Sequence, residues 1–421
     1  MRLAVAGLTH LGICMAIAAH EAGLEVVAFD TDLGRVAAAR NAEFDAAEPG
    51  VVDFLCKPSE RFVITDEIAL VAQADLVMIA IDTVLDAHGD NDDHEVVALL
   101  ESLALHVPAG MPIVVASQVR PGFTRAHAHL HPCLYYFMET LIFGRGLERA
   151  MRPERYIVGC ANAEQPLPTA LQEYLDVPAC PVHVMSYESA ELTKLSANFV
   201  LSASITAANS LADLAQRLGA DWQDIESALR DDRRIGEQAY ISAGLGIGGA
   251  NLTRDLHGIK SMADRLGADS SLSTTMLRHS TYMRDWILRT LVGVRDDVAL
   301  ERLAVLGLAY KPGTQSTRGG SGMDLVTTFE AVLDVVVHDP AVALPARPGA
   351  SRARQVRDVE EAVSAAQVIA ITTPWPEYAG AVREFLGTDP ETIIIDPYRL
   401  VDRGWARSMR TRIIQLGVSD A

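Results

Sequence analysis

Short apolar runs gather near the two ends of the chain, and stretches with apolar residues at helical spacing separate them. The runs cover residues 2–6, 25–29, 76–81 and 113–117 in the first group and 302–307, 335–338, 368–372 and 392–396 in the second. Continuous apolar runs of this length, alternating with helices, are typical of parallel strands buried on both faces of a sheet. We therefore predict an α/β protein with a doubly wound, Rossmann-like parallel-sheet domain at each end.

The middle of the chain has a different pattern. Residues 189–290 lack such runs and are rich in alanine and leucine at helical spacing. We predict one long helix, or two in close succession, over residues 188–219, with small residues that suit close helix packing. A central helical segment between two Rossmann-like halves also suggests a homodimer interface. The predicted domains are residues 1–188, 189–292 and 293–421.

Charge narrows the class of partner. The formal net charge of −19 argues against a nucleic-acid or membrane-surface binder, because phosphate surfaces attract lysine and arginine. No apolar stretch reaches the roughly 20 residues that span a bilayer. The first residues run directly into a glycine-containing loop without the features of a signal peptide. We therefore predict a cytoplasmic protein.

The cysteines point to neither a disulfide framework nor a metal site. Cys14, Cys56, Cys133, Cys160 and Cys180 are odd in number and have no CxxC spacing. We predict that all five are buried, reduced thiols, and we predict no bound metal.

The first strand leads into a degenerate dinucleotide-binding loop. In GxGxxG the first glycine forms the tight turn, the second lets the backbone approach the pyrophosphate, and the third allows close helix packing. Here the loop is GLTHLG, so Gly7 and Gly12 are kept and Thr9 replaces the second glycine. Asp30 ends the second strand, where a carboxylate binds the ribose hydroxyls and favours NAD over NADP. We predict NAD binding; the alternative is a purely structural βα turn.

Later segments, taken in order over nearly the whole chain, resemble the UDP-glucose/GDP-mannose dehydrogenase family. The segments that carry the resemblance are ADLVMIAIDT (74–83), METLIFGRGLERAMRPERYIVG (138–159), AELTKLSANFVLSASITAANS (190–210), DDRRIG (231–236), GIGGANLTRD (246–255), GLAYKPGTQSTRGGS (307–321), VHDP (337–340), TTPWPEY (372–378) and IIDPYR (394–399). Each segment alone is a weak signal, and the ordered set is specific.

The resemblance implies an NAD-dependent enzyme whose C-terminal domain binds a nucleotide sugar, most simply a UDP-sugar. It assigns cofactor contacts to Gly7, Thr9, Leu11, Gly12, Asp30, Thr83 and Arg318. It assigns substrate contacts to Glu139, Leu141, Arg234, Gly248 and Lys311, and catalysis to Lys194, Asn198, Asn251 and Asp255. Five of these residues also have a non-functional alternative. Lys194 would be a solvated lysine, Asp255 a helix N-cap or first-turn acid, and Arg234 the partner of a neighbouring carboxylate. Lys311 and Arg318 would be charged residues of a surface loop.

Members of this family are expected to oxidise a sugar carbinol twice, through a cysteine thioester in a GFGGSCFPKD motif. Asn251 stands at the cysteine position here, and an amide cannot form a thioester. Gln118 replaces a threonine that helps place water, and Phe143 replaces a second glutamate. The groups expected for the second, hydrolytic half are therefore missing together.

Three hypotheses follow. The first is an oxidoreductase that stops after one hydride transfer or returns the hydride to give an isomer. The second is a complete four-electron dehydrogenase with a relocated nucleophile or direct oxidation of an aldehyde hydrate. The third is a non-catalytic protein that binds a nucleotide sugar, for which the altered loop at Thr9 is the argument.

Overall fold

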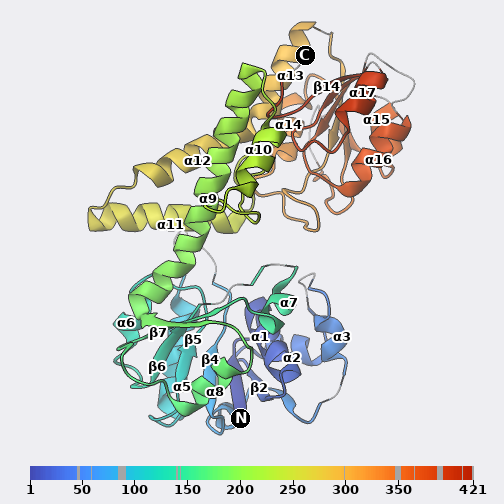
Figure 1. The fold of residues 1–421 in the computed structure, drawn as a ribbon. Coiled ribbons are helices and arrows are strands. Elements are labelled where there is room, and N and C mark those ends of the chain that lie inside the picture. Colours follow the sequence, from blue (N-terminus) through green and yellow to red (C-terminus); the bar gives the residue numbers. More distant parts are fainter. Residues whose placement is uncertain are drawn as a thin grey trace. The chain divides into compact units, whose positions relative to one another are not determined.

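The computed structural model describes residues 1–44, 48–57, 59–83, 92–138, 141–142, 144–297, 299–346, 352–364, 366–385, 392–409 and 411–419. By its internal contacts the chain divides into two compact units, residues 1–197 and 198–421. Each unit is built on one main sheet (Figure 1).

The first unit is a doubly wound α/β domain. Within the described residues, its strands have the order β3-β2-β1-β4-β5-β6-β7-β8, and the neighbours pair in parallel except β6 with β7. The strands are β1 (Arg2–Ala6), β2 (Glu25–Phe29), β3 (Phe62–Thr65), β4 (Leu76–Ile79), β5 (Ile113–Val115), β6 (Leu134–Phe137), β7 (Tyr156–Cys160) and β8 (Val182–Ser186). The helices are α1 (His10–Glu21), α2 (Leu33–Arg40), α3 (Val51–Leu55), α4 (Ile68–Val71), α5 (His94–His106), α6 (Phe123–His127), α7 (Gly146–Met151) and α8 (Thr169–Asp176).

The second unit joins a helical part to another parallel sheet. Its helical part holds most of α9 (Tyr187–Leu218), with α10 (Trp222–Asp231), α11 (Ala250–Leu266), α12 (Ser271–Arg284) and α13 (Trp286–Asp297). Within the described residues, the sheet order is β11-β10-β9-β12-β13-β14 and all its neighbours pair in parallel. Its elements are β9 (Arg302–Leu306), α14 (Ser321–Phe329), β10 (Asp334–His338), β11 (Ala353–Gln355), α15 (Val359–Ser364), β12 (Val368–Ile371), α16 (Pro376–Phe385), β13 (Ile393–Ile395), α17 (Arg403–Ser408) and β14 (Arg412–Ile414).

The cores follow the two-residue period of buried strands. On β1, Leu3 and Val5 belong to one apolar cluster, and Ala4 and Ala6 belong to the cluster on the other face. The second sheet repeats this alternation along β9. Because both faces of each strand are apolar, both faces of each sheet must be covered, as the continuous apolar runs predict. The α/β fold with two Rossmann-like sheets is confirmed.

The central prediction is confirmed in its simpler form. The segment 187–218 is a single 32-residue helix, α9, rather than two helices. Within the second unit, Ala208 and Ala212 of α9 pack in one cluster with Trp286 of α13 and Leu303 of β9. The helical part therefore shares a core with the C-terminal sheet. Among the described helices, none joins the length to the apolar character that crossing a membrane would take.

Candidate functional site

The loop after β1 makes the close crossing that a dinucleotide fold needs. Gly7 has φ +111°, and a Cβ there would lie 2.6 Å from the Ile81 side chain. A Cβ on Gly12 would lie 1.7 Å from the carbonyl oxygen of Gly7, so only glycine allows α1 to pack this closely against the strand. The first and third positions of the predicted motif therefore have the geometry expected of them.

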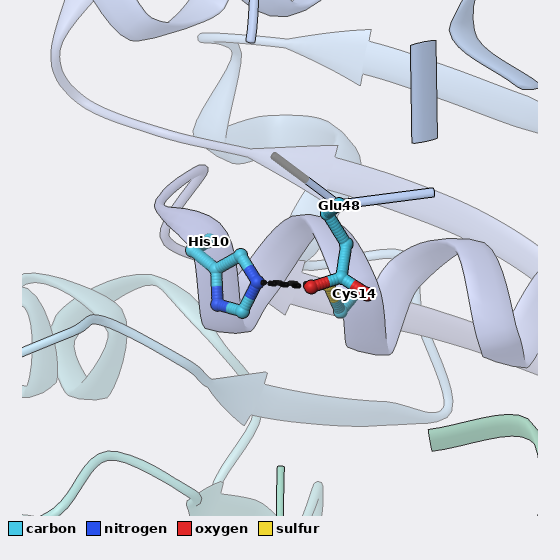
Figure 2. Close-up of side chains that lie close together, drawn as sticks. All are labelled: His10, Cys14 and Glu48. Carbon is cyan, nitrogen blue, oxygen red and sulfur yellow. Dashed lines mark hydrogen bonds and ion pairs between the residues drawn. The ribbon is translucent and has the colours of Figure 1, made fainter. Parts of the chain in front are cut away.

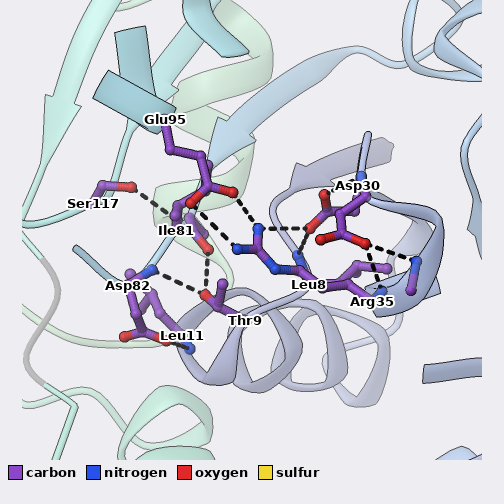
Figure 3. Close-up of polar contacts among 12 residues, drawn as sticks. Leu8, Thr9, Leu11, Asp30, Arg35, Ile81, Asp82, Glu95 and Ser117 are labelled. Atoms are coloured by element: carbon purple, nitrogen blue, oxygen red, sulfur yellow. Dashed lines mark hydrogen bonds and ion pairs between the residues drawn. The ribbon is translucent and has the colours of Figure 1, made fainter. Parts of the chain in front are cut away.

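Asp30 lies buried at the carboxyl end of β2, with 3% of its surface exposed. Its Oδ2 accepts a hydrogen bond from the Leu8 N–H at 2.7 Å, and its Oδ1 accepts one from the Asp32 N–H at 2.8 Å (Figure 3). Arg35 Nη1 lies 3.5 Å from Asp30 Oδ2 and also pairs with Glu95, whose hydrogen bond raises the pKa of the guanidinium. Asp30 is thus hydrogen-bonded to the glycine-containing loop after β1, the loop with which it was predicted to bind the cofactor.

The second sheet repeats this arrangement. Gly307 has φ +114°, and a Cβ on Gly322 would lie 2.1 Å from the carbonyl oxygen of Gly307. Asp339, just after β10, accepts a hydrogen bond from the Leu308 N–H at 2.6 Å, as Asp30 does from Leu8. Both units therefore contain a hydrogen bond from the loop after the first strand of the βαβ motif to the acid after its second strand.

Thr9, at the second glycine position, bonds to the segment that follows β4. Its Oγ1 accepts a hydrogen bond from the Asp82 N–H at 2.9 Å and lies 3.3 Å from the Ala80 carbonyl oxygen. The Asp82 carboxylate in turn accepts a hydrogen bond from the Leu11 N–H at 2.9 Å, in the first turn of α1 (Figure 3). Thr83 donates a hydrogen bond to the Gln118 carbonyl at 3.0 Å. The predicted cofactor residues Thr9, Leu11 and Thr83 thus line the same strand ends.

The glycine crossing and Asp30 fit the binding of NAD, whereas Asp82 obstructs the place where the pyrophosphate of NAD would bind. The crossing at Gly7 and Gly12 is the one a dinucleotide needs. Asp30 uses two of its roughly four acceptor positions on backbone N–H groups and a third faces Arg35, which leaves about one acceptor position for a ribose hydroxyl. At the start of α1, where a pyrophosphate would bind the helix N-terminus, the Asp82 carboxylate already binds Leu11.

A second cluster lies on the adjoining face of α1. His10 Nε2 is 2.9 Å from Glu48 Oε2 and 3.8 Å from the Cys14 sulfur (Figure 2). The Glu48 oxygens also accept hydrogen bonds from the backbone N–H groups of Gly144 at 3.0 Å and Leu147 at 3.1 Å.

The ligand atoms of His10, Cys14 and Glu48 lie within 4.8 Å of one another, and such side chains can bind zinc. Burial, and then the charges of Glu48 and Asp82, raise the pKa of the Cys14 thiol, whereas zinc binds the thiolate. With Glu48 already bonded to His10 and to two backbone N–H groups, we interpret the cluster as a structural tie between α1 and the start of α7.

Replacing Glu48 with alanine is expected to lower the thermal midpoint of the protein by about 5–10 °C. The change removes the carboxylate that accepts from the partly buried Gly144 N–H and the buried Leu147 N–H and that pairs with His10, at a cost of about 2–3 kcal/mol. Scanning calorimetry measures the shift, with the exposed Glu43→Ala as control. Equal midpoints for the two variants would contradict the structural interpretation.

The burial of the five cysteines differs from the prediction that all of them are buried. Cys14 and Cys160 are buried, and Cys133 and Cys180 are partly exposed. Cys56 is exposed, so the prediction that all five are buried is wrong. Cys56 is the C-cap of the short surface helix α3, where only Val51 is buried, and the apolar pattern gave no sign of this edge.

The second unit brings two predicted catalytic residues together. Asn198 on α9 donates a hydrogen bond through Nδ2 to Asp255 Oδ2 on α11, at 2.5 Å. Asp255 is 2% exposed, and its Oδ1 accepts a hydrogen bond from Arg254 Nε at 2.9 Å. The alternative for Asp255, a helix N-cap or first-turn acid, is wrong, because α11 begins at Ala250, its N-cap is Gly249, and its first turn holds no acid. Asp255 instead holds an amide and a guanidinium.

The glycine segment before α11 is packed between two other elements of this unit. A Cβ on Gly246 would lie 2.6 Å from the Ser280 carbonyl oxygen, and one on Gly249 would lie 2.9 Å from the Tyr310 ring. Gly248 also faces that ring, at 3.0 Å. This packing fixes the start of α11, where Asn251 is exposed in the first turn.

The loop after β9 lies against the same glycine segment. A Cβ on Gly319 would be 3.6 Å from the Gly249 nitrogen, next to the exposed Arg318. Lys311 lies partly buried beside Tyr310, with its Nζ 5.6 Å from the ring centroid. The predicted residues Gly248, Asn251, Lys311 and Arg318 therefore belong to loops that contact each other within one unit.

The other predicted substrate and catalytic residues are distributed differently: Arg234 lies in the second unit, Leu141 and Lys194 lie in the first, and Glu139 lies outside the described residues. Arg234 is exposed and pairs with Asp232 through Nη2–Oδ2 at 2.5 Å, which is the ion-pair alternative. This hydrogen bond raises the pKa of Arg234 and lowers that of Asp232. Leu141 packs against the core of the first unit. Lys194 lies on α9 in the first unit, and Glu139 and Phe143 lie outside the described residues.

Several residues of these sites were missed from the sequence. Asp82, Glu48, Arg254 and Tyr310 form the contacts described above, yet none was singled out. The GxGxxG pattern directed attention to Gly7, Thr9 and Gly12 of the loop. The available signal for Asp82 was an acid directly after the apolar run 76–81. Arg254 directly precedes Asp255, a predicted catalytic acid, and this position was the clearest signal that the sequence offered for any of the four.

Comparison with known families matches three consecutive domains of a single family. Its NAD binding domain matches residues 1–166, its central domain matches 188–280, and its UDP binding domain matches 304–403; all three are described as UDP-glucose/GDP-mannose dehydrogenase family. The matched ranges cover most of the first sheet, of the helical part and of the C-terminal sheet.

Individual proteins agree with this match over most of the chain. The UDP-glucose 6-dehydrogenase TuaD of Bacillus subtilis is 27% identical, over 89% of this chain and 84% of its own length. The UDP-glucose 6-dehydrogenase of Pseudomonas aeruginosa is 28% identical, over 90% of this chain and 88% of its own length. The structure of a UDP-glucose dehydrogenase from Pyrobaculum islandicum has a TM-score of 0.80 and 26% identity, covering 99% of this chain and 98% of that one.

Proposed function

Because this chain belongs to the UDP-glucose/GDP-mannose dehydrogenase family, we propose that it is an oxidoreductase that performs one two-electron step on a nucleotide sugar. Its N-terminal domain is the NAD binding domain of that family, and NAD is its cofactor. The UDP binding domain at residues 304–403 supports a UDP-sugar as the substrate.

The observation that carries the proposal is the environment of Asn251. Asp255, one helical turn beyond Asn251 on α11, accepts a hydrogen bond from Asn198 of α9, while Asn251 itself offers no thiol. All five cysteines of the chain precede residue 198, and none belongs to the unit that holds Asn251 and Asp255. The first oxidation needs no nucleophile on the protein, whereas thioester formation does.

In the proposed step, a sugar carbinol loses a hydride to NAD and a proton to the protein, giving a carbonyl compound, NADH and a proton. Asn198 uses its second Nδ2 hydrogen to bind the carbinol oxygen, because the first is held by Asp255. The resemblance adds Lys194, whose ammonium group stabilises negative charge on that oxygen. Asp255 takes up the hydroxyl proton through a water molecule. If the carbinol is a secondary alcohol, its product is a ketone, and return of the hydride to the other face of that ketone would give an isomer instead.

The test is incubation of the purified protein with NAD and a panel of UDP- and GDP-sugars, followed by mass spectrometry. The expected product is lighter than its substrate by two hydrogens, with one NADH formed per product and no acid. A sugar acid with two NADH per molecule would contradict the proposal and indicate a four-electron enzyme.

The Asp82 carboxylate at the start of α1 supports a second candidate, a protein that binds nucleotide sugar without turnover. Calorimetric titrations with NAD and with UDP-sugars separate the two. Binding of a UDP-sugar without measurable binding of NAD, even at millimolar concentration, would favour the non-catalytic role.

A further inference from the structure

The first turn of α1 is well suited to bind phosphate. The initial N–H groups of a helix have no partner within the helix, and they attract anions together with the helix dipole. α1 begins at His10, and its N-cap, Thr9, makes no side-chain cap hydrogen bond. The Leu11 N–H instead donates to Asp82 Oδ2 at 2.9 Å, so a carboxylate of the protein lies where a phosphate would bind.

Thr9 helps to hold this carboxylate in place. Its hydroxyl accepts a hydrogen bond from the Asp82 N–H at 2.9 Å and lies 3.3 Å from the Ala80 carbonyl (Figure 3). A glycine at position 9 would offer no such acceptor. The departure from the glycine motif and the acid at position 82 are therefore parts of one arrangement.

The second sheet gives an internal comparison. Strand pairing places Ile79 opposite Ala6 in the first unit and Ile371 opposite Leu306 in the second. Counting on from these partners, Asp82 corresponds to Pro374, so the βαβ crossing does not itself require an acid at this place. The carboxylate is a special feature of the cofactor-binding unit.

We infer that Asp82 competes with the pyrophosphate of NAD for the N-terminus of α1 and thereby sets the affinity for the cofactor, with Thr9 as its positioning residue. The inference rests on the proposed function, since it concerns the same cofactor site. Asp82 is exposed, so its side chain can turn into solvent when a dinucleotide binds. Binding then loses the Asp82–Leu11 hydrogen bond and leaves a carboxylate near two negative phosphates.

Two substitutions separate the charge of Asp82 from its hydrogen bond. Asp82→Asn removes the charge and keeps an oxygen that can accept from the Leu11 N–H, and Asp82→Ala removes both. NAD binding to the full chain is measured by calorimetric titration. Asp82→Asn is expected to tighten binding by about tenfold, and Asp82→Ala by at least as much.

The matched control is Glu21→Gln, which removes an exposed acid of the same charge at the far end of α1. It is expected to leave the dissociation constant for NAD within about twofold. Thermal unfolding of all variants without NAD checks that the fold is kept, since Asp82 and Glu21 are both exposed.

Ionic strength gives a second readout, which a merely structural role would not move. Salt screens the repulsion between Asp82 and the pyrophosphate, so the advantage of Asp82→Asn over the wild type should shrink between low and high salt. Equal affinities of wild type, Asp82→Asn and Asp82→Ala, or weaker binding by both variants, would overturn the inference. So would a failure of all three proteins to bind NAD.

Failure of the inference and failure of the proposed function are distinguishable. Tighter NAD binding by the Asp82 variants with no product from any nucleotide sugar would support the inference and contradict the proposed function. Turnover by the wild type, with unchanged affinity in the variants, would do the reverse.

Discussion

Replacing Asn251 with cysteine is expected to convert a two-electron oxidation into a four-electron one. The new thiol would lie in the first turn of α11, a 17-residue helix. A helix N-terminus lowers the pKa of a thiol and favours the nucleophilic thiolate. The thiolate adds to the carbonyl of an aldehyde product, the thiohemiacetal loses a hydride to a second NAD and a proton to solvent, and a thioester remains. Water then releases the acid and restores the thiol.

Product analysis and protein mass spectrometry measure the conversion together. The Asn251→Cys variant should form two NADH per sugar acid, whereas the wild type forms one NADH and no acid. Gln118 and Phe143 stand where the family resemblance places groups for hydrolysis, so we expect slow release of the acid. A covalent acyl adduct on the introduced thiol should therefore build up.

Asn251→Ser is the matched control for this conversion, because its hydroxyl has a far higher pKa than a thiol and should not form the acyl intermediate. If Asn251→Cys makes neither adduct nor acid while still producing the carbonyl compound, the expected position of residue 251 in the site is contradicted.

Replacing Asp255 is expected to have the second large effect. Asp255→Asn removes the proton acceptor and the charge partner of Arg254, and it should lower kcat by about 100-fold or more. Asp264→Asn is the matched control, since Asp264 lies on the same helix, is exposed, and pairs with Lys260. The control should retain full turnover.

A double variant distinguishes a catalytic role of Asp255 from a structural one. In Asn198→Asp with Asp255→Asn, the hydrogen bond between the two side chains can form in the reverse direction, so much of any lost stability should return. The carboxylate, however, then lies on α9 instead of α11, and turnover should stay low. Recovery of both stability and turnover would show that the pair acts only by holding the helices together.

The fold was predictable because its strands are buried on both faces. The apolar runs at 2–6, 25–29 and 302–307 correspond closely to β1, β2 and β9, and each is followed by a helix or a recognisable turn. Six strands of the described residues were not identified; they are β3, β6, β7, β8, β11 and β14. In β8 no residue is fully buried, so the continuous apolar signal of a central strand is absent there.

The candidate sites were predictable only in part. Asn198 and Asp255 were found through family resemblance. Their contact joins two residues that are 57 positions apart and lie on different helices, and periodicity cannot locate such a contact. The contact of Asp82 with Leu11 depends on the pairing of β1 with β4 across a crossover. A single sequence does not specify this pairing. Arg234 was chosen by motif, and a carboxylate two residues away is its observed partner.

The shared bond between a loop N–H and the acid after the second strand has a consequence for how such proteins change over evolutionary time. Leu8 binds Asp30 and Leu308 binds Asp339 in the same way, in two domains with different matched ligands. An acid that closes its own loop is costly to lose even after its ligand is gone. A lineage that no longer used the cofactor would therefore keep Asp30 long after selection for catalysis had ended. The presence of Asp30 in such a protein would then be evidence for the fold and not for cofactor binding.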